Sequence, residues 1–191
     1  MKNEDNFNEF DCNAKLSFRE TIKLIKDDLK PYSEPFWKSV LFIPGFKYTT
    51  HHRLCYFFYK NKLFFPLFVL WRLYMYHLTY LYGIQTAWNR SLPPKFTISH
   101  FGGINFFPHS CGHHIYLRQG VTIGNNGRGN NRHPIIGNFV EFGANSVVVG
   151  PIKVGNNVKI GANAVVTKNV PDNCVVAGIP AKIIKELPPL K

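Results

Sequence analysis

The sequence predicts a mainly β protein, a parallel β-helix that follows an α-helical N-terminal region. Three observations support this: apolar residues recur every six positions in the C-terminal half, glycine follows most of them, and helical patterns fill the N-terminal part. With 191 residues, 45% of them hydrophobic, the chain suffices for one domain or a small domain with an appendage. We expect residues 1–84 to form the helical region and residues 85–191 the β-helix.

The first helix is predicted by its capping residues. Residues 1–14 are polar and acidic, which predicts a disordered start and argues against a secretory signal peptide. Ser17 and Glu20 then match a capping box, and apolar residues follow at helical spacing as far as Leu29. We therefore expect a helix from about Ser17 to Lys30 and a second, short helix over residues 35–43.

Residues 46–84 are aromatic and basic and predict one or two further helices. The stretch 63–84 is apolar over about the length of a membrane span, but Arg72 near its centre would be costly in a bilayer. Three interpretations stay open: a helix packed in an oligomer interface, a helix lying on a membrane surface, and, least favoured, a true span. The second implies peripheral contact with the cytoplasmic face of the membrane.

The six-residue repeat is the strongest signal. Its apolar positions from residue 136 onward are Ile136, Phe142, Val148, Val154, Ile160 and Val166. A second small or β-branched residue lies four positions beyond each of them. A period of six excludes a helix and a simple meander and predicts three faces per coil, with these residues pointing inward. We expect the glycines to sit at corners, where a positive φ is needed. The pattern slips near residues 109–114, which predicts one shortened coil.

A polar segment interrupts the repeat at residues 125–134. This run, NNGRGNNRHP, contains no apolar side chain and cannot form a coil face. We therefore expect a loop extruded from the prism, which is a natural place for functional residues.

Charge and cysteine usage narrow the function classes. Residues 1–34 carry six Lys/Arg and eight Asp/Glu, whereas residues 35–191 carry seventeen Lys/Arg and three Asp/Glu. The scarcity of carboxylates in residues 35–191 argues against a metal site or an acid–base pair built on paired carboxylates, so no metal is expected. The excess positive charge of this part favours an anionic ligand. The four cysteines are scattered, as expected of reduced thiols in the cytoplasm. No nucleic-acid-binding motif accompanies the positive charge.

Four segments carry a family resemblance. PGFKYTTHHRL (44–54), ISHFGG (98–103), GVTIGNNGRGNNRHPIIG (120–137) and VPDNCVVAGIPAKII (170–184) resemble the hexapeptide-repeat acyltransferases. The similarity is greatest to serine acetyltransferases and their polysaccharide-modifying relatives. It implies a left-handed β-helix, a homotrimer with each active site between two subunits, and acetyl-CoA as co-substrate.

The resemblance also assigns the catalytic residues. His100 matches the family's catalytic base, and His133 matches a second histidine that positions substrate or acts as an alternative base. Three positions where serine acetyltransferases carry aspartate read Gln85, Ser99 and Asn131 here. These three residues and Arg132 are the candidate substrate-binding residues. Glu141, the only carboxylate within the repeats, is a possible substitute partner for His100.

For coenzyme A the resemblance points to the backbone of two Gly-Ala corners, Gly143-Ala144 and Gly161-Ala162. Lys159, Lys168 and Lys182 are candidates for its phosphates. Because a free amino acid would lose its counter-charges here, the sequence favours O-acetylation of a sugar hydroxyl in capsule, exopolysaccharide or O-antigen synthesis. Serine O-acetylation in cysteine biosynthesis is the alternative, and a β-helix that serves only as a scaffold is a third.

Overall fold

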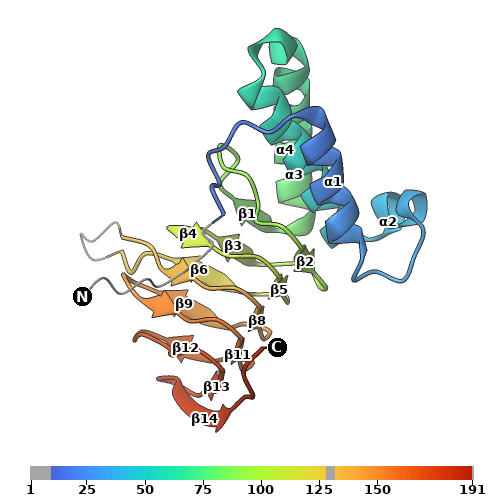
Figure 1. The fold of residues 1–191 in the computed structure, drawn as a ribbon. Coiled ribbons are helices and arrows are strands. Elements are labelled where there is room, and N and C mark those ends of the chain that lie inside the picture. The colour runs from blue at the N-terminus through green and yellow to red at the C-terminus, as the bar shows by residue number, and fades with distance from the viewer. Residues whose placement is uncertain (1–9, 128–131, 191) are drawn as a thin grey trace.

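A computed structural model describes residues 10–127 and 132–190. In Figure 1 the helices lie together at one end, and the strands stack away from them in successive layers. The helices end at Tyr82 and the strands begin at Ile84. A single residue, Gly83, thus separates the last helix from the first strand.

The helical end contains four α-helices and one short 3₁₀ turn: α1 (Phe18–Leu29), α2 (Phe36–Phe42), α3 (Pro44–Lys60), η1 (Lys62–Phe64) and α4 (Phe65–Tyr82). The capping box is confirmed, because Ser17 Oγ accepts from the Glu20 N–H at 3.2 Å and the Glu20 carboxylate accepts from the Ser17 N–H at 2.8 Å. The two helices predicted over residues 17–30 and 35–43 are both present, as α1 and α2. Residues 46–84 form mainly the two helices α3 and α4.

No helix among the described residues is both long enough and apolar enough to cross a bilayer. The 18 residues of α4 include Arg72 and several polar rings. The membrane-span interpretation of residues 63–84 is therefore not supported. The structure does not choose between an oligomer interface and a membrane surface.

The strands form three sheets, which we call faces A, B and C. Face A contains β1 (Ile84–Thr86), β3 (Ile104–Phe106), β6 (Thr122–Gly124), β9 (Val147–Val149) and β12 (Val165–Val166). Face B contains β2 (Phe96–Ile98), β5 (Ile115–Leu117), β8 (Val140–Phe142), β11 (Val158–Ile160), β13 (Cys174–Ala177) and β14 (Lys182–Glu186). Face C contains β4 (Ser110–Cys111), β7 (Ile135–Ile136) and β10 (Lys153–Val154). From β3 to β12 the chain visits the faces in the repeating order A, C, B, and every pairing is parallel except that of β13 with β14.

The inward positions of the repeat are confirmed. All six apolar residues at period six are at most 3% exposed, and so are Val140, Val158 and Ala164 from the second series. Stacked aliphatic side chains fill the prism and form one continuous core with the adjoining helices. A ligand of this protein must therefore bind outside the coils.

The repeat glycines sit at corners as expected, but the expected positive φ is wrong. Gly137 and Gly143 do not have positive φ, and the left-handed positions fall instead on asparagines such as Asn145, Asn157 and Asn163. A Cβ on Gly137 would lie 2.5 Å from the carbonyl oxygen of Gly155 in the next coil. These glycines are required because neighbouring coils approach each other closely at the corners, not because the turn needs a left-handed residue there.

The shortened coil is present near residues 109–114. Asn105 pairs with Thr122, 17 positions on, whereas Val147 pairs with Val165, 18 positions on. In this coil His114 has φ 58°, and the rings of His113 and His114 lie 4.7 Å apart. No group of three potential metal ligands is found in the described ranges.

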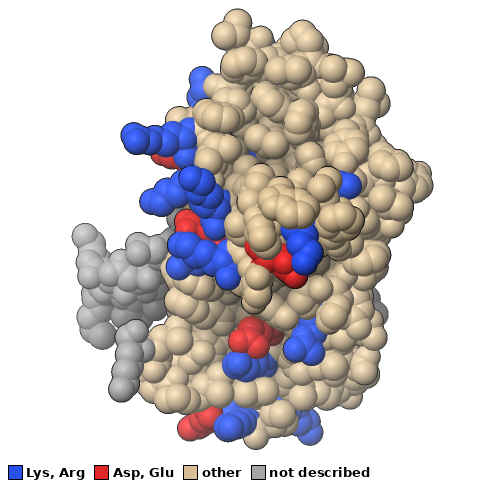
Figure 2. Space-filling model, turned by 90° about the vertical axis from the view of Figure 1, so that its right-hand side faces the viewer, with Lys and Arg blue, Asp and Glu red and all other residues tan. Residues whose placement is uncertain are grey.

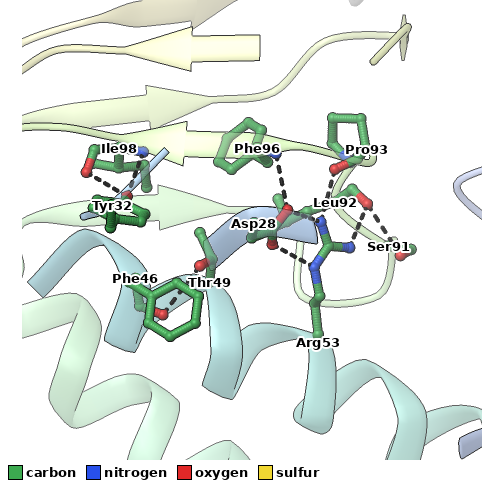
Figure 3. A network of polar contacts seen from close by, with 10 residues as sticks. All are labelled: Asp28, Tyr32, Phe46, Thr49, Arg53, Ser91, Leu92, Pro93, Phe96 and Ile98. Carbon is green, nitrogen blue, oxygen red and sulfur yellow. Dashed lines mark hydrogen bonds and ion pairs between the residues drawn. The ribbon is translucent and has the colours of Figure 1, made fainter. Parts of the chain in front are cut away.

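A buried ion pair attaches the helices to the β-helix (Figure 3). Arg53 of α3 donates from Nε and Nη2 to the Asp28 carboxylate at 2.7 and 2.9 Å, and from Nη1 to the Leu92 carbonyl oxygen at 2.8 Å. Asp28 also accepts from the Phe96 N–H of β2 at 2.9 Å. The pair is almost fully buried, so it fixes α1, α3 and β2 relative to one another.

The first residues of α3 also pack closely against β2. Pro44 begins the helix, and a Cβ on Gly45 would clash with the carbonyl oxygen of Ile98. Phe46 is fully buried. The segment PGF…HR therefore has a structural role at this junction.

Residues 10–14 make defined contacts, contrary to the expectation of disorder. The Cys12 carbonyl oxygen accepts from the Ser91 N–H, and the Ala14 carbonyl oxygen accepts from Tyr56 Oη, both at 2.8 Å. Residues 1–9 lie outside the described ranges.

Candidate active site

The candidate residues lie along two edges of the prism that border face A. At the edge we call BA, the chain turns from face B into face A, as between β2 and β3. At the edge we call AC, it turns from face A into face C, as between β6 and β7. Each edge collects residues that are far apart in the sequence.

His100 lies on edge BA, in the turn between β2 and β3, and is exposed. Ser99 beside it has a buried hydroxyl oxygen with no hydrogen-bond partner among the described residues. Gln85 lies on β1, next to Asn105 of β3, and no hydrogen bond joins it to His100 in the described structure. The residue that replaces the family's aspartate therefore does not orient this imidazole.

The two Gly-Ala corners lie on the same edge, in the turns after β8 and β11. They stack on each other: the Asn163 N–H donates to the Ala144 carbonyl oxygen at 2.9 Å, and a Cβ on Gly143 would lie 2.5 Å from the Ala162 nitrogen. Between these corners and His100, the same edge carries the exposed Arg118 and Gln119 in the turn between β5 and β6. The structure thus brings His100, Gly143, Ala144, Gly161 and Ala162 together on one edge.

His133 lies on edge AC, and a backbone contact fixes its ring. Its Nδ1 lies 2.7 Å from the carbonyl oxygen of Phe107. A carbonyl only accepts hydrogen bonds, so Nδ1 carries the hydrogen and Nε2 of the neutral ring keeps its lone pair. The neighbouring Arg132 is exposed, and Asn131 lies outside the described ranges, together with residues 128–130 of the predicted loop.

The three lysines do not converge. Lys159 on β11 forms an ion pair with Glu141 on β8 at 2.9 Å. Lys168 follows β12 on edge AC, and Lys182 begins β14 on face B. Glu141 therefore has a partner other than His100, and no single site in one chain contains all three cations.

One chain also keeps the two histidines apart. His100 precedes β3, while His133 contacts the residue that follows β3, so they lie at opposite ends of that strand. A three-residue strand spans about 10 Å at roughly 3.3 Å per residue. The two rings therefore cannot act on the same atom within one chain.

Sequence analysis missed a second feature, a cleft of about 710 Å³ between α4 and face A. Its lining includes Arg72, Gln85 and Trp88. Only Gln85 carried a signal in the sequence, because the other two residues meet only after the chain has folded.

Comparison with known proteins places these features in a family. The model of the bacterial transferase hexapeptide family (six repeats) matches residues 133–168. The serine acetyltransferase of Bacillus pumilus (strain SAFR-032) is 31% identical over 172 residues, which cover 85% of this chain and 77% of that enzyme. The chain belongs to the serine acetyltransferase family of hexapeptide-repeat acyltransferases.

The chain is also similar to acetyltransferases with different names. The putative colanic acid biosynthesis acetyltransferase WcaB of Escherichia coli (strain K12) is 41% identical over 119 residues, which cover 62% of this chain and 72% of WcaB. Among solved structures, Neisseria gonorrhoeae serine acetyltransferase (CysE) is similar, with TM-score 0.73 and 27% identity over 91% of this chain and 70% of that one. The chain spans 59% of the length of the 35% identical serine acetyltransferase of Synechococcus elongatus.

Proposed function

We propose that this protein is an acetyl-CoA-dependent O-acetyltransferase that modifies a hydroxyl group of a sugar. The observation that carries the proposal is edge BA, where an exposed histidine and two stacked Gly-Ala corners lie on the same edge of the prism. Acyl transfer requires a base and a surface on the same side against which an extended thioester can lie.

The proposed chemistry is direct transfer. His100 takes the proton of the acceptor hydroxyl while that oxygen attacks the thioester carbonyl carbon. The carbon–sulfur bond then breaks, and the leaving thiolate takes the proton from the imidazolium. His133, with Nε2 available, positions the acceptor. Neither a metal nor a covalent enzyme intermediate is needed.

Coenzyme A is proposed to lie along edge BA. Ala144 and Ala162 have no backbone hydrogen-bond partner for their N–H groups in the described ranges, whereas the Gly143 and Gly161 N–H groups donate to the next coil. Free amides at successive levels suit the amide groups of a pantetheine arm. Lys168 of a neighbouring subunit is the better phosphate candidate, because Lys159 is already paired with Glu141.

A homotrimer of left-handed β-helices is part of the proposal. Because one chain separates His100 from His133, a site that uses both needs edge BA of one subunit against edge AC of the next. Residues 85–191 then supply the catalytic unit, and residues 1–84 form its helical end. We place the protein in the cytoplasm, in peripheral contact with the inner face of the membrane through residues 63–84.

The acceptor is proposed to be a sugar because the positions of three family aspartates read Gln85, Ser99 and Asn131. An ammonium group bound there would lack its carboxylates, at a cost of about 1–3 kcal/mol for each charged hydrogen bond. The name of WcaB, a putative colanic acid biosynthesis acetyltransferase, points the same way.

Serine O-acetylation remains the second candidate, because relatives such as those from Bacillus pumilus and Neisseria gonorrhoeae are named serine acetyltransferases. Thiol release from acetyl-CoA in the presence of free serine or of oligosaccharides separates the two. We expect turnover with an oligosaccharide and none above background with serine. Efficient turnover with serine alone would contradict the proposed acceptor.

A further inference from the structure

The cleft between α4 and face A has the form of a ligand site. Tyr76 and Tyr80 of α4 form one side, and Gln85 and Trp88, in and after β1, form the other. Its volume of about 710 Å³ is within the range of small-molecule sites, about 300–1,000 Å³. This space can hold a short oligosaccharide.

The lining carries a single positive charge that no carboxylate neutralises. Arg72 is the only Lys, Arg, Asp or Glu that lines the cleft, and it has no carboxylate partner among the described residues. Its guanidinium lies 4.0 Å from the Tyr76 ring centroid and 5.1 Å from that of Trp88. His52 also lines the cleft, but burial lowers its pKa to about 3, so it is neutral near pH 7.

The other lining groups suit a carbohydrate. The ring of Tyr80, which is 87% exposed, can pack against the C–H groups of a sugar ring, and the side-chain amides of Gln85 and Asn89 can donate to and accept from hydroxyl groups. A guanidinium next to aromatic rings keeps its in-plane N–H groups, with which it can bind a carboxylate or phosphate through two hydrogen bonds.

We propose that this cleft binds the acceptor, a saccharide whose ring carries or adjoins a negative charge, with that charge on Arg72. The inference rests on the proposed function in one respect, that the acceptor is a sugar.

The cleft adjoins one of the two candidate histidines, His133. Phe107 lines it, and the carbonyl oxygen of the same residue accepts the hydrogen bond from His133 Nδ1 at 2.7 Å. A saccharide in the cleft would thus extend toward the imidazole that positions the reacting hydroxyl.

The test is equilibrium binding measured by calorimetry, which does not depend on turnover. Full-length protein is titrated with a disaccharide that contains glucuronic acid, with its neutral glucose counterpart, and with glucose 1-phosphate. We expect at least one anionic probe to bind about tenfold or more tightly than the neutral one, as for charge-assisted hydrogen bonds. Whether the carboxylate or the phosphate is preferred identifies the source of the charge.

Variants localise the effect. Arg72→Gln should remove the preference for the anionic probe, and Tyr80→Leu should weaken the binding of every probe. Arg118→Gln is the matched control, because Arg118 is exposed and does not line the cleft. Should Arg72→Gln fail to fold, Arg72→Lys keeps the charge but not the two-pronged geometry, and a weaker preference for the anion is expected.

Three results would overturn the inference: no probe binds, the anionic probes bind no more tightly than the neutral one, or Arg118→Gln acts as strongly as Arg72→Gln. Selective binding without acetyl transfer would support the cleft and contradict the proposed function. Acetyl transfer to neutral and anionic acceptors alike, unaffected by Arg72→Gln, would contradict the cleft and support the proposed function.

Discussion

At the scale of single residues, the environment of each histidine decides what its ring can do. His133 is fixed through Nδ1, which leaves Nε2 for a substrate, whereas His52 donates from Nε2 to the Ala87 carbonyl oxygen at 3.3 Å and is buried. His100 is exposed in a turn of edge BA. Residue type alone did not distinguish these roles.

His100→Ala should lower kcat by about 10²–10⁴-fold, the usual effect of losing a general base, with little change in coenzyme A affinity. Steady-state kinetics and coenzyme A binding measure the two effects. Near-normal turnover would show that another group is the base.

His133→Asn tests the positioning role. The asparagine amide can still donate to the Phe107 carbonyl oxygen, but it lacks Nε2. We expect a raised KM for the acceptor and a lower kcat, with an unchanged melting temperature. An unchanged acceptor KM would contradict the role.

His52 should make stability depend on pH. Its pKa is lowered by burial to about 3 from 6.5, so the unfolded chain binds a proton that the folded chain does not. Stability is complete above pH 6.5 and falls as the pH drops toward 3, by about 1.4 kcal/mol per pH unit for this residue. Urea unfolding at pH 7 and pH 5 measures it.

Replacing His52 by Gln should reduce that dependence by the share of one residue, because His51 and His114, whose pKa values burial lowers to about 4, keep contributing. The same change at the exposed His109 should leave the dependence as it is. An equal slope in wild type and His52→Gln would show that other groups cause the loss.

At the scale of elements, close approach of neighbouring coils determines where glycine is needed. Gly137→Ala should destabilise the protein by about 1–3 kcal/mol, because its new Cβ would lie 2.5 Å from the Gly155 carbonyl oxygen. Gly124→Ala is the control, since a Cβ there would have nothing within 4 Å and the φ of this residue is not left-handed. Thermal unfolding of the two variants measures this difference in stability. Equal losses of stability in both variants would contradict the packing explanation.

The sequence predicted those elements whose signal is local or periodic. α1 was predicted from its cap, and the six-residue period located the inward residues. Features that depend on the folded backbone were not predictable from the sequence. Examples are the close approach of coils at the repeat glycines, the contact between the His113 and His114 rings, and the contact of Arg72 with Trp88 in the cleft. For the site, the family motifs supplied the histidines, but the sequence could not show that they lie on different edges.

At the scale of the whole molecule, the two edges predict complementation between subunits. In mixed trimers of His100→Ala and His133→Ala chains, a site is complete where an intact His100 meets an intact His133. About one quarter of the sites in a random equal mixture satisfy this condition. We expect coexpressed variants to recover about that fraction of wild-type activity, which is more than either variant shows alone.

Light scattering of the same sample should give the mass of a trimer. No recovery of activity in confirmed mixed trimers would place both histidines of each site in one subunit.

The helical end predicts binding to anionic membranes. Leu70 and Leu73 of α4 are 63% and 62% exposed, and residues 35–191 carry a formal charge of +14. In Figure 2 the upper end of the visible face shows few charged side chains, while most Lys and Arg lie below it. Because each cation near such a surface contributes about 1 kcal/mol, binding to anionic vesicles should occur at low salt and weaken as salt rises.

Vesicle co-sedimentation across a salt series measures this binding, with neutral lipid as the control. Leu70→Ser and Leu73→Ser together should reduce it. Absence of binding to anionic vesicles at low salt would favour the oligomer-interface interpretation of α4.

The stacking of coils also sets distances along edge BA. Face A advances by three strand-to-strand steps from β3, beside His100, to β12, beside Gly161-Ala162. Each step is about 4.8 Å, so the distance from His100 to the farther corner is set at roughly 14 Å. It can change only in whole coils, since a partial insertion would turn the inward side chains outward. If the thioester carrier lies along this edge as proposed, its reach must match a whole number of coils, and one coil added between His100 and that corner would move the reacting carbonyl a full step away from His100.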